Sequence, residues 1–385
     1  MGEISKRVRN NDGRMNLPLL TISARYGWMT QQSRFSASIA GREKKNYTLL
    51  KKHQLSYNHG NSKVAIYGTV YELTDYDEAL VPKVYHSFFL TSENSSKFIE
   101  SYFHTKKLDV QLRKFIASTA RMDGLLNISF DDFMKVKLFA PERCEQSKIS
   151  RIINLIEKLI TLQQRKLEQL KQLKTAMLQQ LFVDKNSKQP NLRFKNFNGN
   201  WKERKLGELY SYHNGRAHEQ NQKSNGKYEL INLNSISIDG TLKSCGRYIN
   251  HANEILRQND LVMILSDIAH GKLLGRVAII PQDNKYVLNQ RVALLRPTSK
   301  NINSNFMVSL INNNQRYFHK MGIGTSQLNI SKSTVTESLW QVPKIKEQLV
   351  VGKFLQNSAH VINLQQSKID QLNILKKYLL QKLFI

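Results

Sequence analysis

Apolar residues recur at alternating spacings of four and three along two stretches of the chain. This heptad pattern is typical of a helix that pairs with another helix along a narrow apolar seam. In the first stretch the seam positions are Ile149, Ile153, Ile156, Ile160, Gln163, Leu167, Leu170, Lys174, Met177 and Leu181. In the second stretch they are Val351, Leu355, Ser358, Ile362, Gln365, Ile369, Leu372, Lys376, Leu379 and Leu383. The pattern favours two helices that pair with each other over the alternative, an amphipathic helix lying on its own globular domain.

The two helical stretches are copies of one another at a constant offset of 202 residues. Residues 162–183 match residues 364–385 at 12 of 22 positions. The register extends back through a Pro-x-x-x-Glu-Gln motif at residues 141–146 and 343–348, and through the sequence LNIS at 126–129 and 328–331. The Gln and Lys interruptions of the seam also recur, and a polar seam residue costs stability but can fix register. The chain is therefore a tandem duplication of one unit of about 200 residues.

Each helix follows a globular segment with mixed strand and helix patterns. Residues 64–73 are rich in β-branched and aromatic side chains, as strands are, whereas residues 97–105 and 108–116 have helical spacing. Residues 206–342 repeat this order, with strands expected in 261–267, 276–281 and 287–297 and a helix over 305–319. The opening Met1–Ile4 resembles Leu206–Leu209. Residues 190–201 are rich in Pro, Asn, Gly and aromatic residues, and we expect a linker there.

The net charge of the chain indicates the kind of partner that it binds. The 385 residues are 40% hydrophobic, which is globular rather than disordered, and they suggest two or three domains. They carry 58 Lys and Arg against 30 Asp and Glu, a formal net charge of +28. So basic a chain points to a polyanion, nucleic acid first, the alternative being a basic protein with solvated lysine faces.

The two heptad-patterned helices, each preceded by a globular domain, pair most simply antiparallel about a pseudo-two-fold axis. A helix over residues 149–182 would span about 50 Å, enough to set two domains about one turn of B-DNA apart.

Other features exclude function classes. Cys144 and Cys245 are the only cysteines, so the chain has no disulfide framework and no Cys-rich zinc site. No apolar run approaches the ~18 residues of a membrane span, and the opening residues have no apolar core of a secretory signal. We expect a cytoplasmic protein without membrane contact. An adenine methyltransferase needs an Asn/Asp-Pro-Pro-aromatic loop, and no Pro-Pro dipeptide occurs. A phosphate-binding Gly-x-x-x-x-Gly-Lys-Ser/Thr loop and a His-Glu-x-x-His motif are also missing. We therefore predict no catalytic residues and no metal site.

Taken together, these motifs resemble the specificity subunits of type I restriction–modification systems. The resemblance rests on the duplicated Pro-x-x-x-Glu-Gln motif, the Leu/Gln/Lys-rich helix ending in Leu-Phe-Val or Leu-Phe-Ile, and LNIS upstream of it. It also includes the block PNLRFKNFNGNWKERKLGEL at 190–209, residues 17–35, and NQRVALLRP at 289–297. The resemblance spans nearly the whole chain. No single motif in it is decisive, but their order and duplication are specific.

The resemblance implies a mixed α/β chain with two globular target-recognition domains separated by two long antiparallel coiled-coil helices in a pseudo-two-fold internal repeat. The expected boundaries are 1–140 for the first domain, 141–185 for the central helix, 186–342 for the linker and second domain, and 343–385 for the C-terminal helix. Each domain would read one half of an asymmetric bipartite site in double-stranded DNA. The helices would set the spacing and dock two methylation subunits. Those subunits would use S-adenosylmethionine, a restriction and translocase subunit would use ATP and Mg, and this chain would bind no cofactor and catalyse nothing.

Base recognition needs Arg, Lys, Asn or Gln side chains on loops, and phosphate contacts need cations. In the first domain the candidates for DNA contact are Arg25, Gln31, Gln32, Arg34, Asn58, His59, Asn61 and Lys63, with Lys44 and Lys45 for phosphate. In the second domain they are Asp267, His270, Lys272, Asn289, Gln290, Arg291, Thr325, Ser326 and Gln327. The residues expected to set the register of the helices are Gln163, Leu167, Leu170, Gln365, Ile369 and Leu372. For each single candidate, an ordinary surface or turn residue is the competing interpretation.

Two other functions compete with this prediction. One is a stand-alone basic scaffold that binds nucleic acid without a methylation partner. The other is a fused restriction–methylation enzyme, which the missing Pro-Pro and Gly-rich cofactor loops disfavour.

Overall fold

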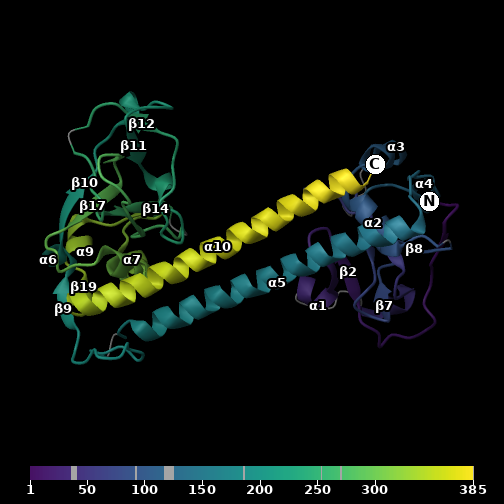
Figure 1. Cartoon of the computed structure of the whole chain (residues 1–385), viewed down its shortest axis with the longest axis horizontal. Coiled ribbons are helices and arrows are strands. Elements are labelled where there is room, and N and C mark those ends of the chain that lie inside the picture. The colour runs from purple at the N-terminus through teal and green to yellow at the C-terminus, as the bar shows by residue number, and fades with distance from the viewer. Residues whose placement is uncertain are drawn as a thin grey trace. The chain divides into compact units, whose positions relative to one another are not determined.

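The computed structural model describes residues 1–35, 41–91, 93–116, 125–184, 187–252, 254–268 and 271–384 (Figure 1). The chain forms two compact units. Unit 1 consists of Met1–Gln164 and Ser367–Ile385, and unit 2 of Arg165–Gln366. The helices α5 (Arg143–Leu181) and α10 (Ile345–Leu383) each begin in one unit and end in the other. The unit boundaries therefore fall within the helices rather than at their ends.

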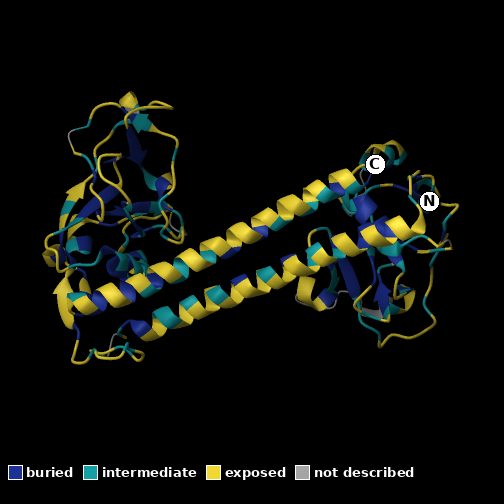
Figure 2. Cartoon of the chain, in the orientation of Figure 1, coloured by how far each residue is buried: buried dark blue, intermediate teal, exposed yellow. Residues whose placement is uncertain are grey.

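Both long helices bury the seam that the heptad pattern predicts. Each helix has 39 residues, a length of about 58 Å, and all twenty seam positions are buried or half-buried (Figure 2). In unit 1 the start of α5 shares a core with the end of α10 through Ile149, Ile153 and Leu380. In unit 2 the end of α5 shares a core with the start of α10 through Leu181 and Val351. This is the arrangement expected of an antiparallel pair.

Unit 1 is built around a four-stranded antiparallel sheet in the order β1-β8-β5-β6. The unit also contains the hairpin β2-β3 and the pair β4-β7, and α2 packs on β6. Its strands are β1 (Ser5–Arg7), β2 (Leu20–Ser23), β3 (Gly27–Thr30), β4 (Thr48–Lys51), β5 (Leu55–Asn58), β6 (Thr69–Glu72), β7 (Glu78–Val81) and β8 (His86–Leu90). Its short helices are α1 (Gln31–Phe35), α2 (Ser96–His104), α3 (Asp109–Phe115) and α4 (Phe130–Met134).

Unit 2 has a four-stranded antiparallel sheet in the order β10-β17-β13-β15 and a three-stranded sheet, β12-β11-β16, in which β11 and β16 are parallel. The pairs β14-β18 and β19-β9 complete it. Its strands are β9 (Lys202–Lys205), β10 (Tyr210–Asn214), β11 (Tyr228–Ile231), β12 (Tyr248–Ile249), β13 (Leu261–Ile264), β14 (Ser266–Ile268), β15 (Val277–Ile279), β16 (Tyr286–Leu288), β17 (Val292–Pro297), β18 (Gln327–Asn329) and β19 (Leu339–Val342). Its helices are α6 (Leu206–Leu209), α7 (Ser304–Asn313), α8 (Gln315–Met321) and α9 (Lys332–Thr336).

Three sequence expectations need correction. The strand expected over residues 64–73 forms only at Thr69–Glu72, because the chain turns at Gly68, whose φ is +81°. The strand expected over 287–297 is two strands separated by a turn at Arg291, where φ is +65°. The helix expected over 305–319 is interrupted at Asn314. The helices expected over 97–105 and 108–116 are confirmed as α2 and α3.

The glutamine of the duplicated Pro-x-x-x-Glu-Gln motif makes the same contacts in both units. Gln146 accepts a hydrogen bond from the main-chain N–H of Ser95, which caps α2, at 3.0 Å. Gln348 accepts one from Asn303, which caps α7, at 2.9 Å. The side-chain amide of each glutamine also donates to the carbonyl of the motif's own proline at 2.9 Å. The motif therefore fastens each long helix to a short helix of the neighbouring globular domain.

The LNIS repeat has an equally local explanation. Its serine is the N-cap of a short helix in both units: Ser129 accepts from the N–H of Asp132, and Ser331 from that of Thr334, both at 3.0 Å. These motifs are therefore parts of the scaffold.

Among the described residues, no helix is long and apolar enough to cross a membrane.

Candidate nucleic-acid interface

In unit 1 the hairpin β2–β3 presents the first candidate to solvent. Arg25 is exposed in the turn between the strands, and its guanidinium lies 5.5 Å from the ring centre of Tyr26, which is 68% exposed. The turn closes at Gly27, where φ is +72° and an added Cβ would lie 3.1 Å from the ring of Tyr71. The Tyr71 hydroxyl donates to the carbonyl of Ala24 and supports the turn from below. A cation and an aromatic ring thus project together from a supported loop.

Two further candidates donate hydrogen bonds to the main-chain carbonyl of Ile22, beside this turn. The Arg34 guanidinium donates to that oxygen at 2.6 Å, and the Asn58 amide at 3.0 Å. Arg34 follows the hairpin on α1, whereas Asn58 ends β5. The Asn58 side-chain oxygen also accepts from the N–H of Gly60, which shapes the loop that follows. The structure therefore brings the Arg25 turn, α1 and the Asn58 loop to one edge of unit 1.

Two candidates in unit 1 lie inside the domain, and the expectation that they line exposed loops is wrong. Gln31 is 4% exposed, and its amide donates to the hydroxyl of Tyr47 at 2.9 Å. His59 is 2% exposed, with both ring nitrogens 2.7 Å from main-chain carbonyls. It stacks on His86 at 4.9 Å, and burial lowers the pKa of His86 to about 4. Gln31 and His59 therefore stabilise their loops through hydrogen bonds inside the domain.

The remaining candidates of unit 1 face solvent. Gln32, Asn61 and Lys63 are exposed. Lys45 is exposed and Lys44 half-buried in the helical turn Gly41–Asn46. These residues are accessible to a polyanion, and their assignment to DNA stays a prediction.

In unit 2 the main chain of Leu265 brings three candidate loops together. Its N–H donates to the carbonyl of Arg291 at 2.9 Å, and its carbonyl accepts from the N–H of Ile330 at 3.0 Å. The turn at 289–291 and the loop at 325–327 therefore lie beside the junction of β13 and β14. Arg291 is exposed in its left-handed turn, and the exposed candidates next to these loops are Lys272, Gln290, Thr325 and Ser326.

Three candidates of unit 2 act within this scaffold. The Asp267 carboxylate accepts from the main-chain N–H groups of Ile268 and Leu273 at 2.8 and 2.7 Å, so it shapes its own turn. The half-buried Gln327 donates to the Ser266 hydroxyl across the β14–β18 ladder. Asn289 is 7% exposed and accepts from the N–H of His218 at 3.2 Å. An exposed base-reading role for Asn289 is therefore wrong, because its amide is buried. His270 lies outside the described residues.

A cavity of about 310 Å³ beside Asn289 is a feature that the sequence did not reveal. Arg216, His218 and His251 line it with Glu254, over a floor that includes Leu256. Arg216 and His251 are exposed and His218 is half-buried. The sequence feature that could have indicated this cavity is the Asn-Gly-Arg turn after β10. Glycine is required there because a Cβ on Gly215 would collide with the Asn289 carbonyl.

The seam candidates lie where the heptad predicts. Leu167, Gln365 and Ile369 are buried, and Gln163, Leu170 and Leu372 are half-buried. Both glutamines are therefore within the helix pair rather than on its surface. Their effect on register stays a prediction.

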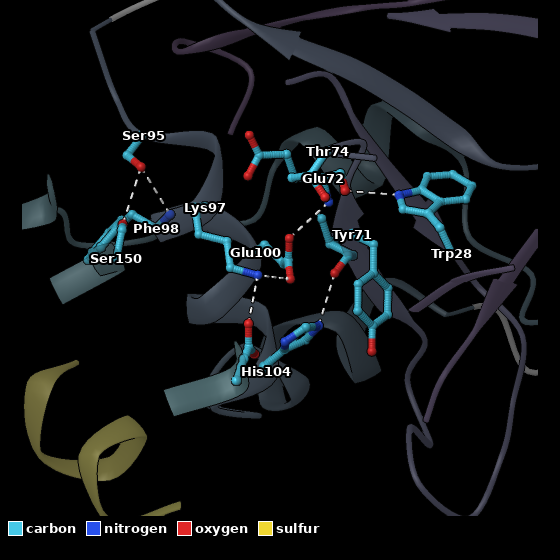
Figure 3. Close-up of polar contacts among 12 residues, drawn as sticks. Trp28, Tyr71, Glu72, Thr74, Ser95, Lys97, Phe98, Glu100, His104 and Ser150 are labelled. Atoms are coloured by element: carbon cyan, nitrogen blue, oxygen red, sulfur yellow. Dashed lines mark hydrogen bonds and ion pairs between the residues drawn. The ribbon is translucent and has the colours of Figure 1, made fainter. Parts of the chain in front are cut away.

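A partly buried ion-pair network links α2 of unit 1 to both long helices, and Figure 3 shows its Lys97–Glu100 pair beside His104. Lys97 on α2 lies 2.7 Å from Glu100 and 2.9 Å from Glu157 on α5, and Lys376 on α10 lies 2.8 Å from Glu157. The two lysines hold the pKa of Glu157 at about 2 despite its burial. Within the described chain, Glu100, His104 and Glu157 also have ligand atoms close enough for a metal ion. However, the Lys97 ammonium already pairs with both carboxylates, so we interpret the cluster as an ion-pair network.

Comparison with known proteins decides the family of the second half. Residues 198–373 match the family model of the type I restriction modification DNA specificity domain. The second half of the chain is therefore similar to a type I DNA specificity domain. The resemblance predicted from the sequence is confirmed by this match.

Comparisons that cover more of the chain agree with the match to this specificity domain. The MjaVIII type I restriction enzyme specificity subunit of Methanocaldococcus jannaschii is 20% identical over 282 residues, which cover 70% of this chain and 66% of that protein. A type I restriction–modification S subunit from M. genitalium has a TM-score of 0.63 at 14% identity, covering 99% of this chain and 93% of that one. A chain from a study of complex assembly in the type I system has a TM-score of 0.56 at 13% identity, covering 100% and 96%. At these identities the structures establish a shared fold.

Proposed function

We propose that this chain is the DNA sequence-specificity subunit of a type I restriction–modification complex, and that each globular domain reads one half of an asymmetric bipartite site. The observation that carries the proposal is the repetition of scaffold contacts by Gln146 and Gln348 around loops that differ. A shared scaffold with different loops is what two different half-sites require. The boundaries 1–140 and 186–342 for the two recognition domains, and a pseudo-two-fold relation between them, belong to this proposal.

The helices would set the spacing between half-sites and dock two methylation subunits. Outside the buried seam, each helix carries a second apolar stripe that is exposed. On α5 it runs through Ile152, Leu155, Leu159, Leu162 and Leu173, and on α10 through Val361, Leu364, Leu375 and Tyr378. Leu159, Leu162 and Leu173 correspond to three of the α10 residues at the offset of 202. Exposed apolar patches mark interaction sites, and two related stripes suit two copies of one partner.

In this proposal the chemistry belongs to the partners. Methylation subunits supply S-adenosylmethionine, a restriction subunit supplies ATP- and Mg-dependent cleavage, and this chain supplies site selection in the cytoplasm. The net charge of +28 supports double-stranded DNA as the common substrate.

The test is co-expression with the candidate methylation subunit in a host without adenine methylation, followed by mapping of N6-methyladenine by single-molecule sequencing. Methylation of one bipartite motif with an unread spacer is the expected result. If no motif is methylated although both proteins are soluble, the proposal fails and the stand-alone nucleic-acid scaffold remains as the alternative.

Variants in the two domains sharpen this test. Arg25→Ala should relax recognition in one half-site and Arg291→Ala in the other, because a base contact contributes about 1–3 kcal/mol to discrimination. Lys45→Ala is the matched control, since a phosphate contact weakens binding without changing the motif. Replacing both Gln163 and Gln365 by Leu should stabilise the helix pair and alter the preferred spacing. An unchanged spacing would show that these glutamines do not set register.

A further inference from the structure

The two most exposed large apolar side chains described in unit 2 lie on one small pair of strands. Ile323 is 76% exposed and Ile268 is 67% exposed. Ile268 ends β14 and lies opposite Gln327 of β18, whereas Ile323 is bridged to Asn329 at the other end of β18. Single apolar side chains scattered over a surface are ordinary, but two that flank the same short strand form a local apolar surface.

The strand register places both isoleucines on one face of this pair. Side chains of directly opposite residues, and of residues two positions apart along a strand, point to the same face of a sheet. Gln327 and Asn329 are two positions apart, and each lies opposite one of the isoleucines. Leu328, between them, points the other way and packs on the core of the unit. The face that carries Ile268 and Ile323 is therefore turned away from the core.

The same face carries an accessible amide. Gln327 donates to the Ser266 hydroxyl and, at 3.5 Å, to the side-chain oxygen of Asn329. The Asn329 amide in turn donates to the Gln327 carbonyl at 3.5 Å, and Asn329 is exposed. Hydrogen bonds of that length are weak, so the donor and the acceptor of Asn329 stay accessible to a ligand. The face thus combines an amide with two branched apolar side chains.

The main chain holds this face in place. Ile323 and Asn329 exchange two main-chain hydrogen bonds of 3.0 and 2.9 Å. The turn between them requires a glycine, because φ of Gly324 is +131° and an added Cβ would collide with the Gln327 carbonyl. A backbone fixed in this way presents the isoleucines to solvent and does not fold them back onto the domain.

The surroundings of this face are positively charged. Three segments meet at it: 265–273, 289–291 and 320–330. Their three cationic side chains, Lys272, Arg291 and Lys320, are exposed. Asp267 is the one acid in the sequence of these segments, and its carboxylate accepts hydrogen bonds from main-chain N–H groups. Cations suit the phosphates that position a protein on DNA, whereas amide and apolar groups suit the base edges that specify the sequence.

We propose that this face enters the major groove of the DNA half-site that unit 2 reads, where Ile268 and Ile323 contact the C5 methyl groups of thymine and Asn329 pairs with an adjacent adenine. A two-stranded ribbon fits the major groove, thymine presents its methyl group there, and asparagine matches N6 and N7 of adenine. The inference rests on the proposed function and adds the identity of a base pair to it. The half-site of unit 2 contains at least one A·T pair that is read through its methyl group.

The probe is a labelled duplex that carries the motif found by methylation mapping, and the protein is the full chain in complex with its methylation subunits. Each thymine of the motif is replaced in turn by deoxyuridine, which lacks only the methyl group, and binding is measured by fluorescence anisotropy. We expect at least one replacement to weaken binding about fourfold, the equivalent of the ~0.8 kcal/mol that burial of one such group contributes. Ile323→Ser or Ile268→Ser should weaken binding to the thymine duplex by a similar factor and remove the response to deoxyuridine. Asn329→Ala should relax the preference for adenine in the mapped motif.

Ile238→Ser is the matched control, because Ile238 is 59% exposed in the same unit and belongs to none of the three segments. It should keep both the wild-type affinity and the response to deoxyuridine. The replaced isoleucines are exposed, so the variants should fold, which thermal unfolding checks.

Three results overturn the inference: no thymine of the motif responds, Asn329→Ala keeps the preference for adenine, or the isoleucine variants weaken binding to thymine and deoxyuridine duplexes equally. The last result is the one expected if the isoleucines insert between base pairs. A wild-type complex without a bipartite motif refutes the proposed function together with this inference, whereas a motif without a responding thymine refutes this inference alone.

Discussion

Replacing Glu157 by Gln tests the ion-pair network that joins α2 of unit 1 to α5 and α10. The carboxylate is 24% exposed and lies within 3 Å of the ammonium groups of both Lys97 and Lys376. Glutamine keeps the shape and removes the charge. Lys97 retains Glu100 at 2.7 Å, whereas no other ion pair to Lys376 occurs in the described residues. Removing one partner of a buried pair is costly because the remaining charge is left uncompensated.

The pKa of Glu157 sets the size of the effect. The two lysines lower it from 4.5 to about 2, a difference that corresponds to about 3 kcal/mol of folding stability at pH 7. Because the folded pKa lies below the unfolded one, this stability is present above pH 4.5 and is lost as the pH falls toward 2. The same relation leaves about 1 kcal/mol at pH 3. The variant should therefore differ from the wild type by about 3 kcal/mol at neutral pH and by much less at pH 3.

Hydrogen exchange of the α2 and α5 amides, measured at several pH values, reports the local opening of unit 1. Glu168→Gln is the control, because Glu168 is an exposed glutamate on the same helix and its removal should change stability by less than about 0.5 kcal/mol. Equal effects of the two variants at pH 7 would refute the stabilising role of the network. A difference that stays constant from pH 7 to pH 3 would show that the ionised form of Glu157 is not its basis.

Three further variants probe unit 2, each by chemical denaturation followed by tryptophan fluorescence. Arg193→Met should destabilise unit 2 by about 3 kcal/mol, because it leaves the buried Glu347 carboxylate without its cation; a loss below 1 kcal/mol would contradict this. Gly275→Ala should cost at least about 2 kcal/mol, since its φ is +71° and the new Cβ would lie 2.3 Å from the Phe318 ring; wild-type stability would show that the ring moves freely. Lys174→Met should stabilise unit 2 by up to about 1 kcal/mol, because burial lowers the pKa of that lysine and disfavours its charged form. This gain should shrink as the pH rises toward the pKa of the lysine, and a destabilised variant would contradict it.

Periodicity predicted the long helices well because one property, burial along a seam, determines their pattern. All twenty seam positions are buried or half-buried, including the polar Gln163 and Gln365, whose place in the pattern alone identified them. The strands were predicted less well. Residues 287–297 were expected to form one strand, yet the chain turns at Arg291, where φ is +65°.

The candidate loops were predicted by residue type, and type does not reveal which way a side chain faces. Asn58 and His59 are neighbours in a polar loop, but the first ends a strand at the edge and the second is held between two main-chain carbonyls. The carbonyls come from Val84 and Leu126, which are distant in sequence. A buried polar residue finds its partners through the tertiary fold, so composition alone cannot separate it from a ligand-binding one.

The duplicated Pro-x-x-x-Glu-Gln motif also shows that residue type alone does not reveal the contacts of a residue. Comparing the two copies of the motif, however, shows which contacts are repeated. Repetition of Glu and Gln in the Pro-x-x-x-Glu-Gln motif predicts equal roles for both residues. The structure assigns the glutamine equal contacts in both units, because each globular domain offers it a helix cap. The glutamate differs, since Glu347 has an arginine from the preceding segment and Glu145 is exposed. A repeated residue whose contacts are not repeated therefore identifies a place where the two copies differ in structure, and that criterion can be applied to any duplicated chain.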